Sequence, residues 1–446
     1  MIFKIKKQTS AYLSALVAII IISTAFTSNL KFSDDDDDYA NDSFLRYEDY
    51  TYDDSIKSVL LYNKRSVLSY PILPINGNEA LELSFDDLRR EYKIYYYQII
   101  HCDANWNPSD LMKNEYVNGF IENEIIDYKL AFSTDLYYTH YKVTFPNSDF
   151  SLSKSGNYIV MVYEENKPET PIITKRFMIF ESQVAIDMKV HRATNVSWQF
   201  HRQEVDFKIS HENYDMPNPF ENLNVVLMKN HRWDNAIHGL KPKFINGTLL
   251  DYDYEDVNVF NGGNEYRDFD LKSIQYQTIN IKRIQFQEDQ MNHAYILDDE
   301  PRAYRQYLSK ADINGNFLIK QNEALDSDID AEYVKVHFTL NYENPLPGGH
   351  LYLFGKFSNW EFKEEMKLEY DTLNSRYYKE VLLKQGYYNY MYCFVGDESK
   401  NKGDLSVIEG SYSETENDYS LLVYHRQIQD TYDRLIGYRK INSAVQ

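Results

Sequence analysis

The sequence predicts an all-β protein made of several sandwich domains, and three observations support this prediction. Short runs of alternating apolar and polar residues, separated by turn residues, recur from residue 56 onward. The chain contains 41 Tyr and 24 Phe, whose side chains fit the pleated, half-buried surface of a strand. Few ten-residue stretches show the periodicity of a helix. A length of 446 residues indicates roughly three domains of about 150 residues each.

The first 30 residues have the pattern of an export signal. Lys4, Lys6 and Lys7 precede an apolar run at residues 11–22, and small and polar residues follow this run. The run is shorter than the ~20 residues that a membrane-spanning helix needs, which favours a cleaved signal peptide over an anchor. We therefore expect an exported mature chain that is not itself inserted in a membrane.

An acidic stretch follows the predicted signal peptide of residues 1–30. Asp34 to Asp38 are five consecutive aspartates, and we expect residues 31–55 to form a solvated linker. Calcium binding is the alternative, but five consecutive carboxylates lack the glycine-centred spacing of a calcium loop. Loss of the signal, which carries three lysines and no acid, changes the formal net charge from −21 to −24. Such a charge disfavours binding to nucleic acid or to anionic lipid surfaces.

The first sandwich is predicted over residues 56–181. Its expected strands alternate between apolar and polar residues, and turn residues such as Ser155 and Gly156 separate them. The clearest expected strands are residues 81–85, 141–145, 157–163 and 175–180.

Two further sandwiches are predicted, over residues 182–325 and 331–440, with an acidic connector between them. The expected strands of the middle domain are residues 184–190, 204–209, 223–228, 274–279 and 315–319. Those of the C-terminal domain are residues 334–340, 351–355, 377–383, 388–394 and 418–424.

The distribution of Cys and His predicts neither a disulfide framework nor a metal site. Cys102 and Cys393, the two cysteines, fall in different predicted domains, so the cores are expected to hold without a bridge, although one bridge joining them is the alternative. Zinc sites need ligand pairs at short, fixed spacing, which the histidines do not show. Several recur every ten residues and others are scattered: His191, His201 and His211, then His231, His238, His293 and His350. We expect no metal and no cofactor.

His101, Cys102 and Asp103 form a sequence that could suggest a catalytic nucleophile. Adjacent residues of a strand point to opposite faces, so His101 and Cys102 cannot easily share a proton. His101 and Asp103 lie on one face, and Trp106 follows them. We interpret the group as structural, with a His101–Asp103 hydrogen bond and Trp106 holding the next loop.

The most unusual stretch is residues 257–270, VNVFNGGNEYRDFD. Gly262 and Gly263 permit a positive φ or a close approach of two backbones, and Asn264 follows them. Glu265 and Arg267 are two residues apart, on one face of an extended chain, where they could satisfy each other. The interpretation is a structural device rather than a catalytic one.

A glycosidase-like pair of carboxylates is the alternative for this stretch. It would combine Glu265 with Asp268 or Asp270. The arginine between them is expected to lower the pKa of the carboxylates, whereas a general acid needs a raised pKa. The sequence therefore favours a site without catalytic residues.

The stretch from Gly355 to Trp360, GKFSNW, resembles the opening of early-set immunoglobulin-like domains, which include glycogen-binding modules. The resemblance implies an early-set-like third domain in a chain of three tandem immunoglobulin/fibronectin-like sandwiches. The motif is short and supports the fold better than it supports a sugar ligand.

Taken together, the motifs resemble those of the plug protein family of the type IX secretion system. The motifs occur in order along nearly the whole mature chain, so the full set of motifs is more specific than any single motif. They are YYQIIHCDANW at 96–106, EYVNGF at 115–120, YTHY at 138–141, SGNY at 155–158, NHRWDNA at 230–236, GGNEYR at 262–267, FD at 269–270 and GKFSNW at 355–360.

This resemblance implies a periplasmic protein without enzymatic activity or cofactor. It implies that the chain binds the very large outer-membrane translocon β-barrel and closes its periplasmic opening while no substrate is engaged. Two alternatives stay open: a secreted glycan-binding β-sandwich protein, and a β-sandwich hydrolase that uses Glu265. Retention on a polysaccharide resin would favour the first, and loss of turnover in Glu265→Gln would favour the second.

Overall fold

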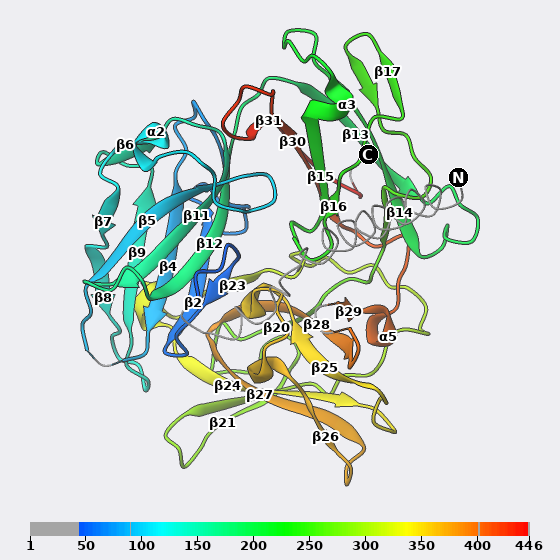
Figure 1. Ribbon diagram of the computed structural model, residues 1–446. Coiled ribbons are helices and arrows are strands. Elements are labelled where there is room, and N and C mark those ends of the chain that lie inside the picture. The colour runs from blue at the N-terminus through cyan, green and yellow to red at the C-terminus, as the bar shows by residue number, and fades with distance from the viewer. Residues whose placement is uncertain (1–43, 90, 400–401, 445–446) are drawn as a thin grey trace, which may run out of the picture. The chain divides into compact units, whose positions relative to one another are not determined.

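Strands form most of the computed structural model, which describes residues 44–89, 91–399 and 402–444 (Figure 1). The predicted all-β class is confirmed. The α-helices of the described residues are single turns: α2 (Lys113–Tyr116), α3 (Pro219–Asn222), α4 (Ser327–Asp330) and α5 (Ser406–Glu409). No helix in these residues has the length and apolar content needed to cross a membrane. The predicted signal peptide and Asp34 to Asp38 lie outside the described residues.

The first sandwich has two sheets whose facing sides share one hydrophobic core. The first sheet runs β1 (Tyr50–Thr51), β12 (Pro171–Phe180), β11 (Gly156–Glu164), β5 (Tyr95–Cys102), β7 (Glu122–Glu124), with β3 (Ile72–Pro74) parallel to β12. The second sheet runs β2 (Ile56–Asn63), β4 (Leu81–Asp87), β9 (Thr139–Phe145), β8 (Asp127–Leu130). A small pair, β6 (Val117–Gly119) and β10 (Phe150–Leu152), adds side chains to the same core.

The second sandwich combines strands that are far apart in sequence. One sheet runs β13 (Ala185–Arg192), β14 (Arg202–Ser210), β18 (Leu249–Asp251), β17 (Phe244–Asn246), with β19 (Val259–Asn261) also on β14. The other runs β16 (Ile237–His238), β15 (Leu223–Lys229), β30 (Asp418–His425), β31 (Arg434–Asn442). Their shared core contains residues of both sheets, among them Val205, Leu227 and Leu421.

The third sandwich lies between these two halves of the second in sequence. One sheet is centred on β28 (Gly386–Gly396), which pairs with β20 (Arg267–Asp270), β23 (Phe317–Ile319), β25 (Gly349–Phe354) and β29 (Gly403–Asp404). The other runs β21 (Ile281–Phe286), β22 (Asn292–Ile296), β24 (Tyr333–Asn341), β27 (Arg376–Lys384), β26 (Glu369–Asp371). The 3₁₀ turns η2 (Lys356–Ser358) and η3 (Glu364–Met366) follow β25.

The strand pairing corrects the predicted boundaries of the second and third domains. Strands between residues 267 and 319 belong to the third sandwich, and residues 418–442 return to the second. The reason lies in β15, which is buried along nearly its whole length and needs a hydrogen-bonded partner on each side. Only two of its residues pair with β16, whereas all seven pair with β30. Alternation in the sequence identifies strands but not such distant partners.

The prediction that residues 31–55 form a solvated linker is also wrong for the described part of this segment, residues 44–55. Tyr50 and Thr51 form β1, which pairs with β12, and the amide of Arg176 donates to the Asp49 carboxylate at 2.7 Å. Leu45 and Tyr47 pack against a hydrophobic cluster of the folded body. Apolar and aromatic side chains between the acids of this segment cover a sheet edge, so its described part belongs to the folded body.

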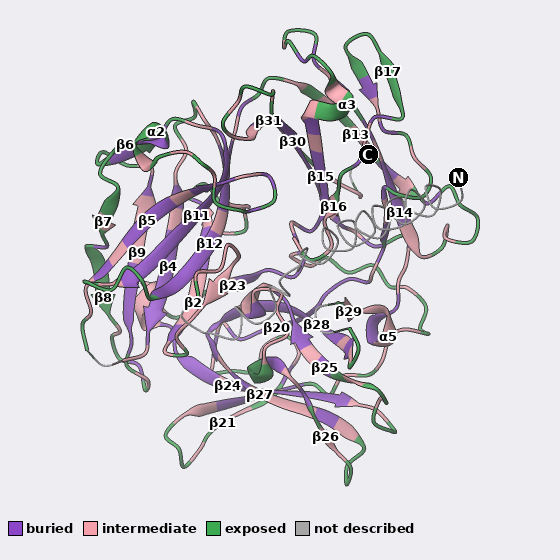
Figure 2. Cartoon of the chain, viewed as in Figure 1, coloured by how far each residue is buried: buried purple, intermediate pink, exposed green. Residues whose placement is uncertain are grey.

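The first and second sandwiches are joined through the outer faces of two sheets. Ile159, Met161 and Met178 of the first pack against Val226 and Leu422 of the second, and all five side chains are buried. Figure 2 shows buried residues along β11, β12, β15 and β30. The contact resembles a domain core more than a surface between mobile domains.

Candidate functional site: the joints between the sandwiches

The chain passes from the second sandwich to the third and back at one place. Gly262 and Gly263 lie between β19 and β20, and residues 410–417 return from α5 to β30. The amide of Tyr412 donates to the Gly263 carbonyl at 2.8 Å, and the Gly263 amide donates to Ser411 Oγ at 3.1 Å. Two hydrogen-bonded passages of chain therefore connect the two sandwiches.

The two glycines have separate roles in this crossing. A methyl group on Gly262 would lie 1.9 Å from the carbonyl oxygen of Tyr412, so no side chain fits there. Gly263 has a φ of +76°, a conformation that costs glycine little. The buried Lys229 Nζ donates to the carbonyls of Asn261 at 2.6 Å and of Gly262 at 3.2 Å, and burial lowers the pKa of Lys229 to about 7.

Arg267 is the centre of a buried charge network. Its Nε donates to Glu409 at 3.0 Å and its Nη1 to Asp299 at 2.6 Å. Arg302 also contacts Glu409, at 2.6 Å. Burial alone would raise the pKa of Glu409, but the two arginines hold it below its usual value. The network ties β20 to α5, next to the returning chain.

Glu265 does not pair with Arg267, contrary to the sequence-based expectation. Its Oε1 accepts hydrogen bonds from the Tyr307 hydroxyl and from the amide of Glu416, the latter at 3.2 Å. The expectation assumed an extended chain, but β20 begins only at Arg267, so strand alternation does not apply to Glu265. Asn264 Nδ2 donates to the Glu409 carbonyl at 2.8 Å.

The carboxylates that approach Glu265 are Asp312 and Glu416, not Asp268 or Asp270. Asp268 is bound by Lys310, and Asp270 by Lys272 at 3.0 Å. Burial raises the pKa of Glu265 and raises that of Asp312 to about 7. The expected lowering of the Glu265 pKa by a neighbouring arginine is therefore wrong, because burial outweighs Arg302. The carboxylate pair of the alternative interpretation, Glu265 with Asp268 or Asp270, therefore does not form.

His101 and Asp103 each hold the loop after β5, but they do so separately. His101 Nδ1 lies 2.8 Å from Ser109 Oγ, its Nε2 lies 3.2 Å from the Ser155 carbonyl, and burial lowers its pKa to about 4. The Asp103 carboxylate accepts from the amides of Asn105 and Asn107, at 2.8 and 2.9 Å. The prediction of a His101–Asp103 hydrogen bond is wrong, because His101 contacts Ser109 and Ser155 whereas Asp103 accepts from amides of its own loop.

This loop places Trp106 against the second sandwich. The rings of Trp106 and Trp233 meet edge to face at 4.9 Å, and the Arg176 guanidinium lies 4.5 Å from the Trp106 ring centre. Trp233 belongs to the loop after β15, in which His231 stacks on Tyr70 at 4.1 Å. One loop of the second sandwich thus contacts two parts of the first.

The same loop reaches the third sandwich through Arg232. Its guanidinium lies 5.0 Å from the Trp360 ring centre and 4.8 Å from that of Phe354. Trp360 also packs on Tyr266 and leaves no room for a side chain at Gly315. Gly355, which opens the predicted motif, lies against the Asn389 carbonyl, 2.9 Å from where its Cβ would stand. Trp360 is thus half-buried and packs within the joint.

A buried ion pair joins the first and third sandwiches. Lys384 Nζ lies 2.7 Å from the Asp86 carboxylate, and both side chains are 1% exposed. The Tyr333 hydroxyl and His140 Nδ1 also contact this carboxylate, each at 2.7 Å. Although burial alone would raise the pKa of Asp86, Lys384 and His140 hold it below its usual value.

A cavity of about 310 Å³ lies where the three sandwiches meet. Its lining includes Tyr70, Arg176, His231, Lys356 and Trp360. Burial lowers the pKa of His231 to about 3 and that of Lys356 to about 8, so each shift favours the neutral form of the group. The cavity is thus part of the joint between the three units.

Comparison with known proteins identifies the family. A family model described as "Type 9 secretion system plug protein 1st domain" matches residues 56–181. The crystal structure at 2.30 Å resolution of a hypothetical protein from Parabacteroides merdae ATCC 43184 is 34% identical, with a TM-score of 0.86. That match covers 90% of this chain and 100% of the other. The chain belongs to the type IX secretion system plug family. No curated protein matches it.

Several residues of the joints in this plug-family chain were not predicted as site residues. Asp86 and Lys384 are 298 positions apart in sequence, and the local signal is an acid at the end of a strand that alternates up to Phe85. Trp233 appears in the motif at residues 230–236, but no pattern links it to Trp106. Cys102 and Cys393 are free and buried, and burial raises the pKa of Cys102 to about 12.

Proposed function

We propose that this plug-family chain is a non-enzymatic periplasmic plug. It binds the outer-membrane translocon barrel of the type IX secretion system from the periplasmic side and occludes the opening while no substrate is engaged. Family membership supports association with that secretion system and a location at the periplasmic side of the outer membrane. The plug family is not an enzyme family, which supports a role without catalysis.

The interlocking of the three sandwiches is the observation that carries this proposal. A barrel that passes folded proteins would leak small solutes, so its closure needs a folded body that keeps its shape. Domains within a chain normally move relative to one another unless their interface is large and apolar. Here a double crossing at Gly262, a buried Asp86–Lys384 pair and an apolar sheet-to-sheet contact restrain such motion.

We assign the barrel contact to one edge of the first sandwich. The edge strands β7 and β8 and their connections carry exposed apolar side chains, and all four residues of β8 are exposed (Figure 2). Phe120 and Phe132 are 68% and 71% exposed, and Ile126 is 77% exposed. Exposed apolar groups gathered on a sheet edge are characteristic of interaction surfaces.

Affinity purification of the chain from its own cells tests the proposal. The translocon barrel is expected to co-purify with the wild-type chain and to be lost with the double variant Phe120→Asp/Phe132→Asp. The matched control is Leu373→Asp/Ile428→Asp, whose side chains are 94% and 99% exposed in other parts of the molecule. Absence of the barrel from the wild-type sample would contradict the proposed function. Equal recovery with both double variants would contradict only the assigned surface. Retention of the purified chain on a polysaccharide resin would instead favour glycan binding.

A further inference from the structure

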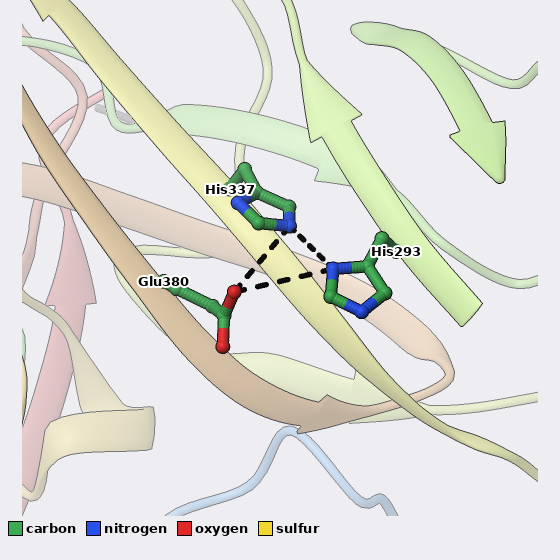
Figure 3. A group of neighbouring side chains, drawn as sticks. All are labelled: His293, His337 and Glu380. Atoms are coloured by element: carbon green, nitrogen blue, oxygen red, sulfur yellow. Dashed lines mark hydrogen bonds and ion pairs between the residues drawn. The ribbon is translucent and has the colours of Figure 1, made fainter. Parts of the chain in front are cut away.

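Two histidines and a glutamate converge on the outer face of the third sandwich (Figure 3). His293 lies on β22, His337 on β24 and Glu380 on β27, which are neighbours in one sheet. His337 and Glu380 are directly opposite each other across β24 and β27. β22 runs parallel to β24 and pairs Tyr295 with His337, so His293 is the diagonal neighbour of His337. Three adjacent strands fix the positions of the three side chains.

The distances between the three ligand atoms suit a tetrahedral metal ion. His293 Nδ1 lies 2.8 Å from His337 Nε2, and Glu380 Oε2 lies 3.6 Å from His337 Nε2 and 3.9 Å from His293 Nδ1. A tetrahedral zinc ion with bonds of about 2.1 Å separates its ligand atoms by about 3.4 Å. Adjustments of about half an ångström would place all three atoms around one ion.

The outer nitrogen of each imidazole ring is already held by a partner. His293 Nε2 lies 3.0 Å from the Asp289 carboxylate, and His337 Nδ1 lies 2.6 Å from the Tyr378 hydroxyl. Carboxylate and hydroxyl partners of this kind orient histidines that bind metals and set which nitrogen is free. Here they direct Nδ1 of His293 and Nε2 of His337 toward each other and toward Glu380 (Figure 3).

A hydrogen bond accounts for the contact between the two rings when no metal is bound. With His293 Nε2 donating to Asp289, His293 Nδ1 carries a lone pair, and His337 Nε2 donates to it. Metal binding at His337 Nε2 moves that proton to His337 Nδ1, where the Tyr378 oxygen accepts it. The proton moves within the His337 ring and leaves its Nε2 free for the metal.

The charges around the site balance. Asp289 and Glu380 bring two carboxylates. Lys335 Nζ lies 2.8 Å from Asp289 and 3.6 Å from Glu380, and the Arg283 guanidinium lies 4.1 Å from the centre of the Tyr295 ring that stacks on His337. The two rings are almost fully buried, at 5% and 6% exposed, whereas the Glu380 side chain is 37% exposed. An ion would therefore be held from beneath by the sheet and would keep one position open to solvent beside Glu380.

We propose that His293, His337 and Glu380 form a binding site for a divalent first-row transition metal, with zinc as the ion. Two imidazole nitrogens and one carboxylate oxygen are a ligand set that zinc accepts, with a fourth position left for water. The site lies on the same face of β24 and β27 as Tyr333 and Lys384, which contact Asp86 of the first sandwich, and the proposal does not depend on the proposed plug function.

Zinc titration of the untagged mature chain, after treatment with a chelator, tests this site. Calorimetry is expected to give one zinc ion per chain. Glu380→Gln removes a ligand at a partly exposed position and is expected to weaken binding at least ~10-fold, and Asp289→Asn should weaken it about 10- to 100-fold. Cobalt in place of zinc should give the visible absorption of a tetrahedral ion, at lower cobalt concentrations in the wild-type chain than in these two variants.

His350→Gln is the matched control, because His350 is an exposed histidine of the same sandwich, with a 53% exposed side chain. Its zinc affinity should equal that of the wild type. Circular dichroism and the thermal midpoint without metal establish that each variant is folded. Stoichiometric binding that is weaker in the Glu380 and Asp289 variants and unchanged in His350→Gln supports the site. Absent binding, or equal binding by Glu380→Gln and the wild type, overturns it.

Discussion

At Gly262 the two passages of chain between the second and third sandwiches come so close that a methyl group has no room. The Tyr412 carbonyl occupies the position, and Tyr412 is itself held by a hydrogen bond to Gly263. A side chain at position 262 would therefore displace the backbone that connects the second and third sandwiches. The two passages can approach this closely because glycine has a hydrogen atom where alanine has a methyl group.

Gly262→Ala is expected to lower the free energy of unfolding by about 1–3 kcal/mol or more, the usual cost of overpacking. Urea unfolding followed by fluorescence measures the change. Gly396→Ala is the matched control, because the nearest atom to its added methyl group would be 3.7 Å away. Equal stability of Gly262→Ala and the wild type would show that the crossing is not close-packed.

His101 makes the stability of the first sandwich depend on pH. Burial lowers its folded-state pKa to about 4, from 6.5 in a model group. The unfolded chain therefore binds the proton first, so this contribution is complete above pH 6.5 and is lost as the pH falls from 6.5 toward 4. Between pH 7 and pH 5 the loss is about 2 kcal/mol.

Comparison of the wild type with His101→Gln isolates this effect, because glutamine does not titrate. The difference in unfolding free energy between the two proteins should shrink by about 2 kcal/mol from pH 7 to pH 5. A difference that stays constant over this range would mean that His101 is protonated as easily in the folded chain as in the unfolded one.

Part of this chemistry could be read from the residues themselves. A glycine pair beside charged residues predicts a close backbone approach, and alternation predicts that His101 and Cys102 lie on opposite faces. The partners of Arg267 could not be predicted, since Asp299 and Glu409 lie 32 and 142 residues away in sequence. Local spacing instead suggested Glu265, which the chain turns toward Tyr307.

At the scale of elements, the loop after β15 joins all three sandwiches. Trp233 meets Trp106 of the first, and Arg232 meets Trp360 of the third. The strand β15 and its partner β30, which support this loop, are far apart in the sequence. Alternation predicts both strands, but only packing of the folded chain brings them together, because hydrogen bonding across a sheet carries no local signature.

Trp233→Ala should cost roughly 2–3 kcal/mol of stability, somewhat less than the ~3–5 kcal/mol of a fully buried tryptophan. Hydrogen exchange should increase in the loop at Trp106, which loses its partner across the joint. Trp198→Ala is the matched control, a half-buried tryptophan that stacks with Arg202 within the second sandwich. Unchanged hydrogen exchange at Trp106 in the Trp233→Ala variant would show that the loop after β15 does not hold the Trp106 loop in place.

At the scale of the whole molecule, the described residues join each sandwich to the other two. The Asp86–Lys384 pair connects the first and third, apolar sheet faces connect the first and second, and the Gly262 crossing connects the second and third. Three pairwise joints leave no unit free to swing about a single hinge. This arrangement is what a closure for a wide pore requires.

Lys384→Met is expected to cost about 3–5 kcal/mol, because it leaves the Asp86 carboxylate buried without its cation. The double variant Asp86→Asn/Lys384→Met should cost less than the sum of the two single changes. Lys282→Met is the control, since its pair with Asp298 is exposed and is worth less than about 1 kcal/mol. Additive costs in urea unfolding would show that Asp86 and Lys384 act independently.

The permeability of the outer membrane tests the proposed plug most directly. Cells that lack the chain are expected to take up large antibiotics that wild-type cells exclude, and the wild-type chain should restore exclusion. Phe120→Asp/Phe132→Asp should fail to restore it, whereas Leu373→Asp/Ile428→Asp should succeed. Unchanged exclusion in the cells that lack the chain, with the translocon barrel present, would contradict the account.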